Sequence, residues 1–214
     1  MIVMNFHEID METFPRRKHF EYFCSLQYPY VGITSNLDVT QLIRFCKERR
    51  YSFFLTFLHI VALAANETRE FRQRIYNNRI IEYDFCSTSH VELLDNGTYC
   101  YCRLNHDMPL EEYMAYARNG RKLAREKVCV EDDESVRGMY FISSVPWLHY
   151  SALIQPVAGG EESNPRITWG KVQKDFNGSD QMPVTVLAHH GLVDGVHIAQ
   201  FYQNVEKKIQ ELVG

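Results

Sequence analysis

Apolar residues recur along this chain with two different spacings. Residues 52–66 are apolar at nearly every position, whereas residues 109–127 and 195–212 carry an apolar stripe on one helical face. A helix that is apolar all round is buried, and a striped helix covers a core with one side. The pattern therefore predicts a buried helix from Ser52 to Asn66 and amphipathic helices from Pro109 to Lys127 and from Gly195 to Leu212.

A further helix is expected to start from a cap at Asn36 or Asp38 and to reach about Arg49. Its apolar face would consist of Leu37, Leu42, Ile43 and Cys46. Seven short stretches have the composition and length of strands, and they are residues 79–83, 87–93, 98–104, 139–142, 148–154, 166–172 and 182–189. Turn residues at 95–97 and at 177–180 join two pairs of them.

Helices come first along the chain, a run of strands follows, and one helix closes it. This order predicts an α+β protein, a two-layer sandwich in which helices cover a mixed, largely antiparallel sheet. No linker or internal repeat divides the 214 residues. We therefore expect a single domain that spans residues 1–214.

Composition narrows the class of protein further. Lys and Arg number 23 against 27 Asp and Glu, a net charge of −4, which argues against a nucleic-acid partner. The longest apolar run, Phe53–Ala65, is too short to cross a bilayer, and the first residues lack the apolar core of a secretion signal. The six cysteines include no CxxC pair. We expect a soluble, cytoplasmic protein without a membrane partner.

The most informative chemistry lies at residues 189–195, which read His-His-Gly-Leu-Val-Asp-Gly and stand between the last strand and the last helix. A histidine is the usual general base for a hydroxyl, provided that its second ring nitrogen is held in one tautomer. Asp194 could fix that tautomer directly, or could hold the loop through a basic partner. Gly195 is expected to allow a tight turn and a close backbone approach.

Two other interpretations of this corner stay open. A histidine at the end of a buried strand is often structural. The set His189, His190, Asp194 and His197 also contains metal-ligand types, but adjacent residues of a strand point to opposite faces, so His189 and His190 do not easily share an ion. We expect no metal and prefer catalysis for the whole pattern.

The HHxxxDG pattern before the last helix resembles the signature of the chloramphenicol acetyltransferase family, within a wider group of acyltransferases. Residues 14–21, Phe-Pro-Arg-Arg-Lys-His-Phe-Glu, resemble that family's N-terminal motif. Further matches, in the family's order, are residues 70–72 with 83–84, residues 143–147 and residues 167–171. The resemblance covers the chain from about residue 5 to its end.

The resemblance implies a catalytic role for His190, as the base that removes the proton of an acceptor hydroxyl while that oxygen attacks acetyl-CoA. It implies that the backbone carbonyl of His190 itself holds the tautomer. Asp194 would be structural, in a bidentate pair with Arg16. Ser143, with Ser144 as the alternative, would donate a hydrogen bond to the oxyanion, and Thr168 would bind a nearby water.

Lys171 would lie near the phosphates of CoA, and Trp147 would line the CoA channel or pack. The resemblance also implies a homotrimer whose active sites lie at subunit interfaces, with acetyl-CoA as cosubstrate and a small hydroxyl compound as acceptor. Chloramphenicol or a relative is the expected acceptor, and antibiotic resistance the expected role.

The acceptor pocket departs from the family pattern. Gln27 stands where an apolar pocket residue is expected, residues 128–134 are charged, and Val172 replaces a tyrosine. A binding homologue with another acceptor, or without turnover, is therefore the main alternative. An acyltransferase core of a 2-oxo-acid dehydrogenase complex is less consistent, because the chain has no lipoyl domain or Ala/Pro-rich linker.

Overall fold

The structure, a computed structural model, describes residues 5–131, 133–159 and 161–214. Ten strands are assigned among these residues: β1 (Phe6–Glu8), β2 (Tyr30–Asp38), β3 (Gln73–Tyr76), β4 (Arg79–Tyr83), β5 (Ser87–Leu93), β6 (Tyr99–Leu104), β7 (Met139–Val145), β8 (Arg166–Gly170), β9 (Gln173–Lys174) and β10 (Asp180–His189). The helices are α1 (Arg17–Cys24), α2 (Thr40–Arg49), α3 (Phe53–Glu67), α4 (Leu110–Lys127) and α5 (Gly195–Val213), with short 3-10 helices η1 (Arg69–Arg72) and η2 (Glu134–Gly138). In this part of the chain no helix combines the length and the apolar character needed to cross a membrane.

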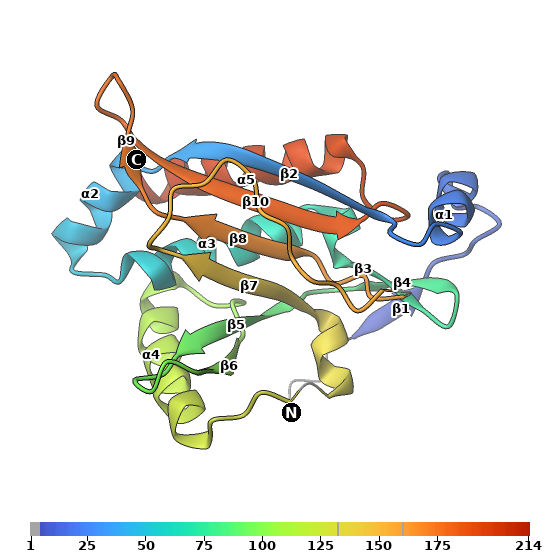
Figure 1. The fold of residues 1–214 in the computed structure, drawn as a ribbon, viewed down its shortest axis with the longest axis horizontal. Helices are drawn as coiled ribbons and strands as arrows, with labels where there is room; N and C mark the ends of the chain where they lie inside the picture. The colour runs from blue at the N-terminus through green and yellow to red at the C-terminus, as the bar shows by residue number, and fades with distance from the viewer. Residues whose placement is uncertain (1–4, 132, 160) are drawn as a thin grey trace.

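The strands form a large mixed sheet and a small antiparallel one. The large sheet has the order β2-β10-β8-β7-β5-β6, with β9 beside β10, and the small sheet has the order β1-β4-β3. Strand β7 runs parallel to β5 and to β8, whereas β10 is antiparallel to both of its long neighbours. As a result β10 points toward α1 while β7 and β8 point the opposite way (Figure 1).

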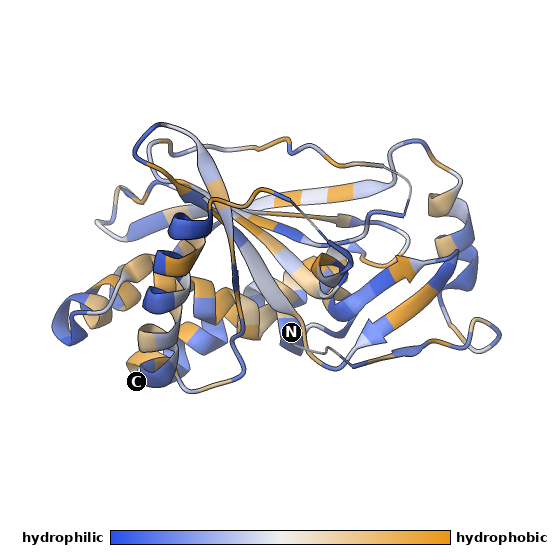
Figure 2. Cartoon of the chain, turned by 90° about the horizontal axis from the view of Figure 1, so that it is seen from below, coloured by the Kyte–Doolittle hydropathy of each residue, from blue (hydrophilic) through white to orange (hydrophobic). Residues whose placement is uncertain are grey.

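Helices α2, α3, α4 and α5 gather on one side of the large sheet (Figures 1 and 2). The segment of residues 148–159 runs across the other side, where residues 153–156 line a cavity against the sheet (Figure 1). Strand β10 is covered from both sides, so its residues 182–189 are all buried. This explains why it carries an almost continuous apolar run rather than an alternating one.

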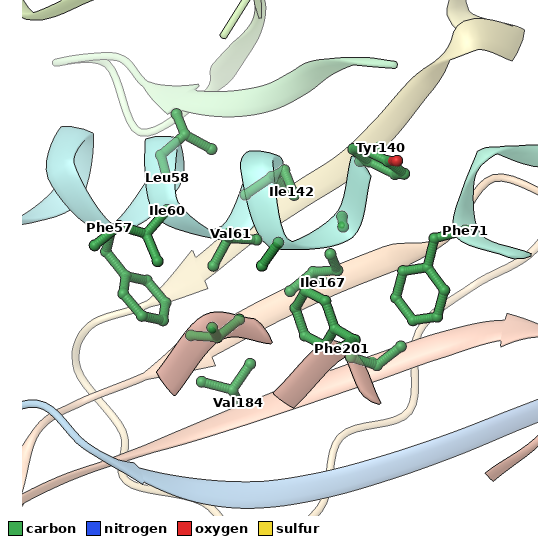
Figure 3. Close-up of a cluster of buried hydrophobic side chains, with 14 of the residues drawn as sticks. Phe57, Leu58, Ile60, Val61, Phe71, Tyr140, Ile142, Ile167, Val184 and Phe201 are labelled. Atoms are coloured by element: carbon green, nitrogen blue, oxygen red, sulfur yellow. The ribbon is translucent and has the colours of Figure 1, made fainter. Parts of the chain in front are cut away.

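Helix α3 forms the centre of the core. Its Phe57 and Val61 project toward Ile167 and Val184 of the sheet, and Phe201 of α5 closes the cluster (Figure 3). The helix packs against α2, α4, α5 and η1, which is why nearly all of its positions are apolar. Ser52 caps its first turn by accepting a hydrogen bond from the backbone N–H of Leu55.

The expected α+β fold with a helix-covered mixed sheet is confirmed. The expected helices at residues 52–66, 109–127 and 195–212 match α3, α4 and α5 within a residue or so. The hairpin at residues 95–97 is also present, with Gly97 at a φ of 81° in the left-handed region.

Two expectations about elements were wrong. Leu37 does not lie on a helix but in β2, where it pairs with Met182 of β10, and α2 begins only at Thr40. The residue before α2 is Val39, so neither Asn36 nor Asp38 is the cap, although Asp38 Oδ1 accepts a hydrogen bond from Thr40 N–H. Residues 148–154 form no strand, because the chain turns back after β7 through a hydrogen bond from Leu148 N–H to the Val145 carbonyl.

Candidate active site

The five residues between β10 and α5 form a tightly held corner. The carbonyl of His189 accepts hydrogen bonds from both Leu192 N–H and Val193 N–H, at 3.0 Å each. The N–H of His190 donates to the carbonyl of Pro29 at 2.7 Å, which ties the corner to the segment before β2. Backbone hydrogen bonds alone therefore hold the corner, both to the end of β10 and to the residue that precedes β2.

The glycine with a crowded neighbourhood in this corner is not the one expected. A Cβ at Gly191 would lie 3.0 Å from Nδ1 of His189, a tight contact that the buried His189 ring would have to relieve by shifting. A Cβ at Gly195 would meet no atom within 4 Å, and Gly195 is not in the left-handed region. The backbone is therefore closely approached at Gly191 and not at Gly195, because the buried His189 ring folds back over Gly191.

The His190 ring lies in a defined position. It stacks on Phe23 of α1 with 3.9 Å between ring centres and 15° between the planes. Its Nδ1 lies 3.0 Å from the Val193 carbonyl oxygen and 3.1 Å from Oδ1 of Asp194. Both oxygens are acceptors, so Nδ1 carries the proton and Nε2 keeps its lone pair. About 30% of the side chain is exposed, so this basic nitrogen is open to a reactant.

The tautomer of His190 is held differently from what the resemblance implied. Its own carbonyl does not contact the ring nitrogen but accepts a hydrogen bond from Nη2 of Arg16 at 3.3 Å. The loop turns back beneath the ring, so the Val193 carbonyl, and not that of His190, accepts the hydrogen bond from Nδ1. The effect on the ring, one protonated and one free nitrogen, is the same.

Arg16 and Asp194 form the expected ion pair, with 2.6 Å between Nη2 and Oδ1. The pair is not bidentate, however. The second amino group of Arg16, Nη1, donates to the Leu192 carbonyl instead of the second carboxylate oxygen. One guanidinium thus joins the carboxylate and two loop carbonyls, and it locks the corner onto the residue that precedes α1.

His197 and Glu70 have a structural role that the sequence analysis missed. The N–H of Asp194 donates to Nδ1 of His197 at 2.9 Å, and Nε2 of His197 lies 3.8 Å from Oε1 of Glu70. His197 stands three residues after Asp194, at the start of α5. That spacing is the one at which a side chain reaches back to the residue before a helix, so it was a usable signal.

His189 is buried beside the corner. Burial, together with the smaller effect of the neighbouring His190, lowers the pKa of His189 to about 4. Its Nδ1 accepts a hydrogen bond from Gly191 N–H at 3.1 Å, while its Nε2 has no partner in the described part of the chain. Among the described residues, no group of three His, Cys, Asp or Glu is arranged to hold a metal ion.

Ser143 and Thr168 lie side by side on β7 and β8, in register with each other. Both line a cavity of about 380 Å³ on the side of the sheet away from the helices. Thr168 is 1% exposed, and its hydroxyl oxygen is buried without a hydrogen-bond partner in the described residues. A buried hydroxyl without a partner is costly, so this cavity is suited to a bound group that supplies one.

A single chain does not bring His190 to Ser143 and Thr168. Thr168 stands opposite Thr185 on β10. His190 follows Thr185 by five residues, a distance of roughly 17 Å along an extended strand. The hydroxyls and the histidine thus occupy different regions of one molecule.

Trp147 and Lys171 lie at the end of the sheet away from His190. Trp147 follows β7 and is 66% exposed, and Lys171 follows β8 and is also exposed. A hydrogen bond of 2.7 Å from Lys171 N–H to the Leu148 carbonyl joins the two segments. The structure therefore brings these two residues together, but on a surface separate from the histidine corner.

Known proteins resemble this chain over almost its whole length. A family model described as chloramphenicol acetyltransferase matches residues 4–206. Chloramphenicol acetyltransferase 2 of Escherichia coli is 27% identical over 209 residues, which cover 95% of this chain and 96% of that protein. Chloramphenicol acetyltransferase of Proteus mirabilis is 24% identical over 212 residues, with 95% and 94% covered.

Solved structures give the same picture of the fold. A chloramphenicol acetyltransferase structure has a TM-score of 0.82 and 25% identity, and the match covers 96% of this chain and 100% of that one. The dihydrolipoamide acetyltransferase of Azotobacter vinelandii has a TM-score of 0.69 at 15% identity, with 90% and 85% covered, so it shares the fold.

Proposed function

Because the chain belongs to the chloramphenicol acetyltransferase family and is an acetyltransferase, we propose that it moves the acetyl group of acetyl-CoA to a hydroxyl of chloramphenicol or a related small molecule. The observation that carries the proposal is the tautomer of His190. Its Nδ1–H is bound by the Val193 carbonyl, which leaves Nε2 as a base at an accessible corner. The reaction would take place in the cytoplasm, where it would give resistance to an antibiotic acceptor.

The proposed reaction begins with proton transfer to Nε2 of His190. As the acceptor hydroxyl loses its proton, its oxygen forms a bond to the thioester carbonyl carbon, and the carbonyl oxygen becomes an oxyanion. Collapse of this tetrahedral intermediate breaks the C–S bond. The proton held by His190 passes to the leaving sulfur, so that the acetyl ester and CoA are released and His190 is neutral again.

Ser143 stabilises the oxyanion in this proposal. It lines the cavity together with Thr168, whose unpartnered hydroxyl is available to a water or to the intermediate. A hydrogen bond to a developing negative charge in a site that excludes bulk water is among the stronger contributions to catalysis. Arg16 and Asp194 touch no reacting atom and act by holding the loop that carries His190.

We propose a homotrimer with active sites at the subunit interfaces, and the same geometry supports a site shared between two copies. His190 and the pair of hydroxyls are too far apart within one chain to act on one substrate. A cyclic assembly would place His190 of each copy against the cavity of the next copy. Lys171 and Trp147 would then bind the phosphates and the extended part of CoA at the opposite end of that cavity.

The release of free thiol from acetyl-CoA tests the proposed activity. Purified protein is incubated with acetyl-CoA and a panel of hydroxyl compounds that includes chloramphenicol, and the thiol is measured over time. We expect release that depends on at least one acceptor. Calorimetric binding of acetyl-CoA without release for any acceptor would instead favour a binding homologue.

Mixed assemblies test where the active site lies. A chain with His190→Ala and a chain with Ser143→Ala are unfolded, mixed in equal amounts and refolded together. If each site takes His190 from one copy and Ser143 from another, random mixing restores about a quarter of the wild-type activity. If both residues act within one chain, no site in the mixture is complete and activity stays at the level of the single variants.

A further inference from the structure

The cavity that holds Ser143 and Thr168 also contains a charged side chain that acetyl transfer does not use. Arg166 stands two residues before Thr168 on β8, so both side chains point to the same face of the sheet. Among the described residues that line the cavity, Arg166 is the only charged one. Its side chain is 14% exposed, so the charge is largely removed from bulk water.

Arg166 is held from behind, outside the cavity. Nη2 pairs with Oε1 of Glu162, which does not line the cavity, and the guanidinium carbon lies 5.0 Å from the centre of the Phe141 ring. The other oxygen of Glu162 accepts a hydrogen bond from Ala158 N–H. Oε1 of Glu162 makes no hydrogen bond among the described residues, so Glu162 holds the arginine through the ion pair.

The rest of the guanidinium is available to a ligand. Arginine has five N–H donors in a rigid plane, and Glu162 engages one edge of it. The side chain of Arg166 makes no hydrogen bond to the residues that the structure describes, apart from this ion pair. An arginine positioned by one carboxylate can present its free edge to a second carboxylate in a bidentate geometry.

Gln155 adds a second donor without a partner. Its Nε2 is buried, has no hydrogen-bond partner among residues 5–131, 133–159 and 161–214, and belongs to a residue that lines the same cavity. Apart from the polar Ser89, the remaining walls are mainly apolar and include Val91, Phe141, Leu153 and Ile154. The cavity thus combines apolar walls with donors that lack acceptors.

We propose that the acceptor is a hydroxyl compound with an apolar body and a carboxylate, and that Arg166 and Gln155 bind this carboxylate. This inference rests on the proposed acetyl transfer, in which Ser143 and Thr168 serve the acetyl group and so leave Arg166 and Gln155 for the acceptor. It changes the proposed acceptor, because chloramphenicol carries no carboxylate. Lys171, which is assigned to CoA, lies five residues beyond Arg166, at the other end of β8. Arg166 is therefore a specificity-determining residue.

Matched pairs of acids and esters test this assignment. Mandelate and phenyllactate are compared with their methyl esters, which keep the hydroxyl and the apolar body but lose the charge. Binding to the intact protein is measured by calorimetry, and turnover by thiol release. We expect the acids to bind 10- to 100-fold more tightly than the esters, the range expected for hydrogen bonds between charged groups.

Variants separate the role of Arg166 from a general loss of structure. Arg166→Met should remove the preference for the acids by raising their Kd and KM while the values for the esters change little. Arg166→Lys should keep part of the preference, because it retains the charge without the planar pair of donors. Arg44→Met, an exposed arginine of α2, is the matched control and should behave as wild type.

The binding and turnover results distinguish two failures. If acids and esters bind equally well to wild type, or if Arg166→Met keeps the preference for acids, the carboxylate assignment is wrong whatever the turnover. If the acids bind in an Arg166-dependent way but no thiol is released with any compound, the carboxylate site stands and the proposed acetyl transfer fails.

Discussion

Replacing His190 by alanine should lower kcat for acetyl transfer by on the order of 10²–10⁴-fold, the range for the loss of a general base. The physical reason is that the Val193 carbonyl keeps Nδ1 protonated, so in the proposed reaction Nε2 would take the hydroxyl proton. The affinity for acetyl-CoA should change little, because Lys171 and Trp147, the residues proposed to bind CoA, lie at the other end of the sheet. Steady-state thiol release gives kcat, and calorimetry gives the affinity.

Two controls accompany the His190→Ala variant: substitution of an unrelated histidine, and addition of imidazole as a base from solution. His7→Ala changes an exposed histidine of β1 and should leave kcat as in wild type. Added imidazole should restore part of the activity of His190→Ala, since it fits where the ring was removed beside Phe23. Equal kcat for wild type and His190→Ala would rule out His190 as the base.

Replacing Ser143 by alanine should lower kcat by about 10²–10³-fold, as expected for the loss of one donor to an oxyanion. KM for the acceptor should change much less than kcat, because the oxyanion forms only in the transition state. Thiol release over a range of acceptor concentrations separates the two constants.

Ser144→Ala is the matched control for this second variant. Ser144 is the next residue of β7, so its side chain points to the opposite face of the sheet and does not line the cavity. We expect Ser144→Ala to keep most of the activity. If Ser144→Ala were the more damaging change, the oxyanion donor would be Ser144 and the cavity assignment would be wrong.

The spacing of apolar residues and the turn residues were sufficient to predict most of the helices and the hairpin. The continuous apolar run of α3, the stripe of α5 and the hairpin at residues 95–97 depend on residues close together in the sequence, and all three are present. Strand β2 was missed although Val31, Ile33 and Leu37 stand at alternate positions, because Asp38 also suited a helix cap. Residues 30–38 form a strand rather than the start of a helix because all of them pair with β10.

The candidate site was predictable in its chemistry but not in its contacts. The HHxxxDG spacing pointed to His190 and Asp194, and the N-terminal motif pointed to Arg16. The stacking of Phe23 on His190 joins segments that meet only on folding. The contacts of His190 with the Val193 carbonyl and of His197 with the Asp194 backbone are local in sequence, but they depend on how the loop turns. The spacing of His197 allowed its contact, whereas the path of the loop decided that Val193 rather than His190 supplies the carbonyl.

His190 shows which features of the site are set by the sequence and which are set by the tertiary structure. The sequence by itself determined that a histidine stands at a strand-to-helix corner. The family resemblance of its motifs added that Arg16 could hold that corner and that the chemistry is acetyl transfer. The tertiary structure alone decided which nitrogen of His190 is basic, that Arg166 faces the cavity of Thr168, and that one chain keeps His190 away from that cavity. The reason is physical: residue types set what chemistry is possible, while strand register and burial set which atoms share one site.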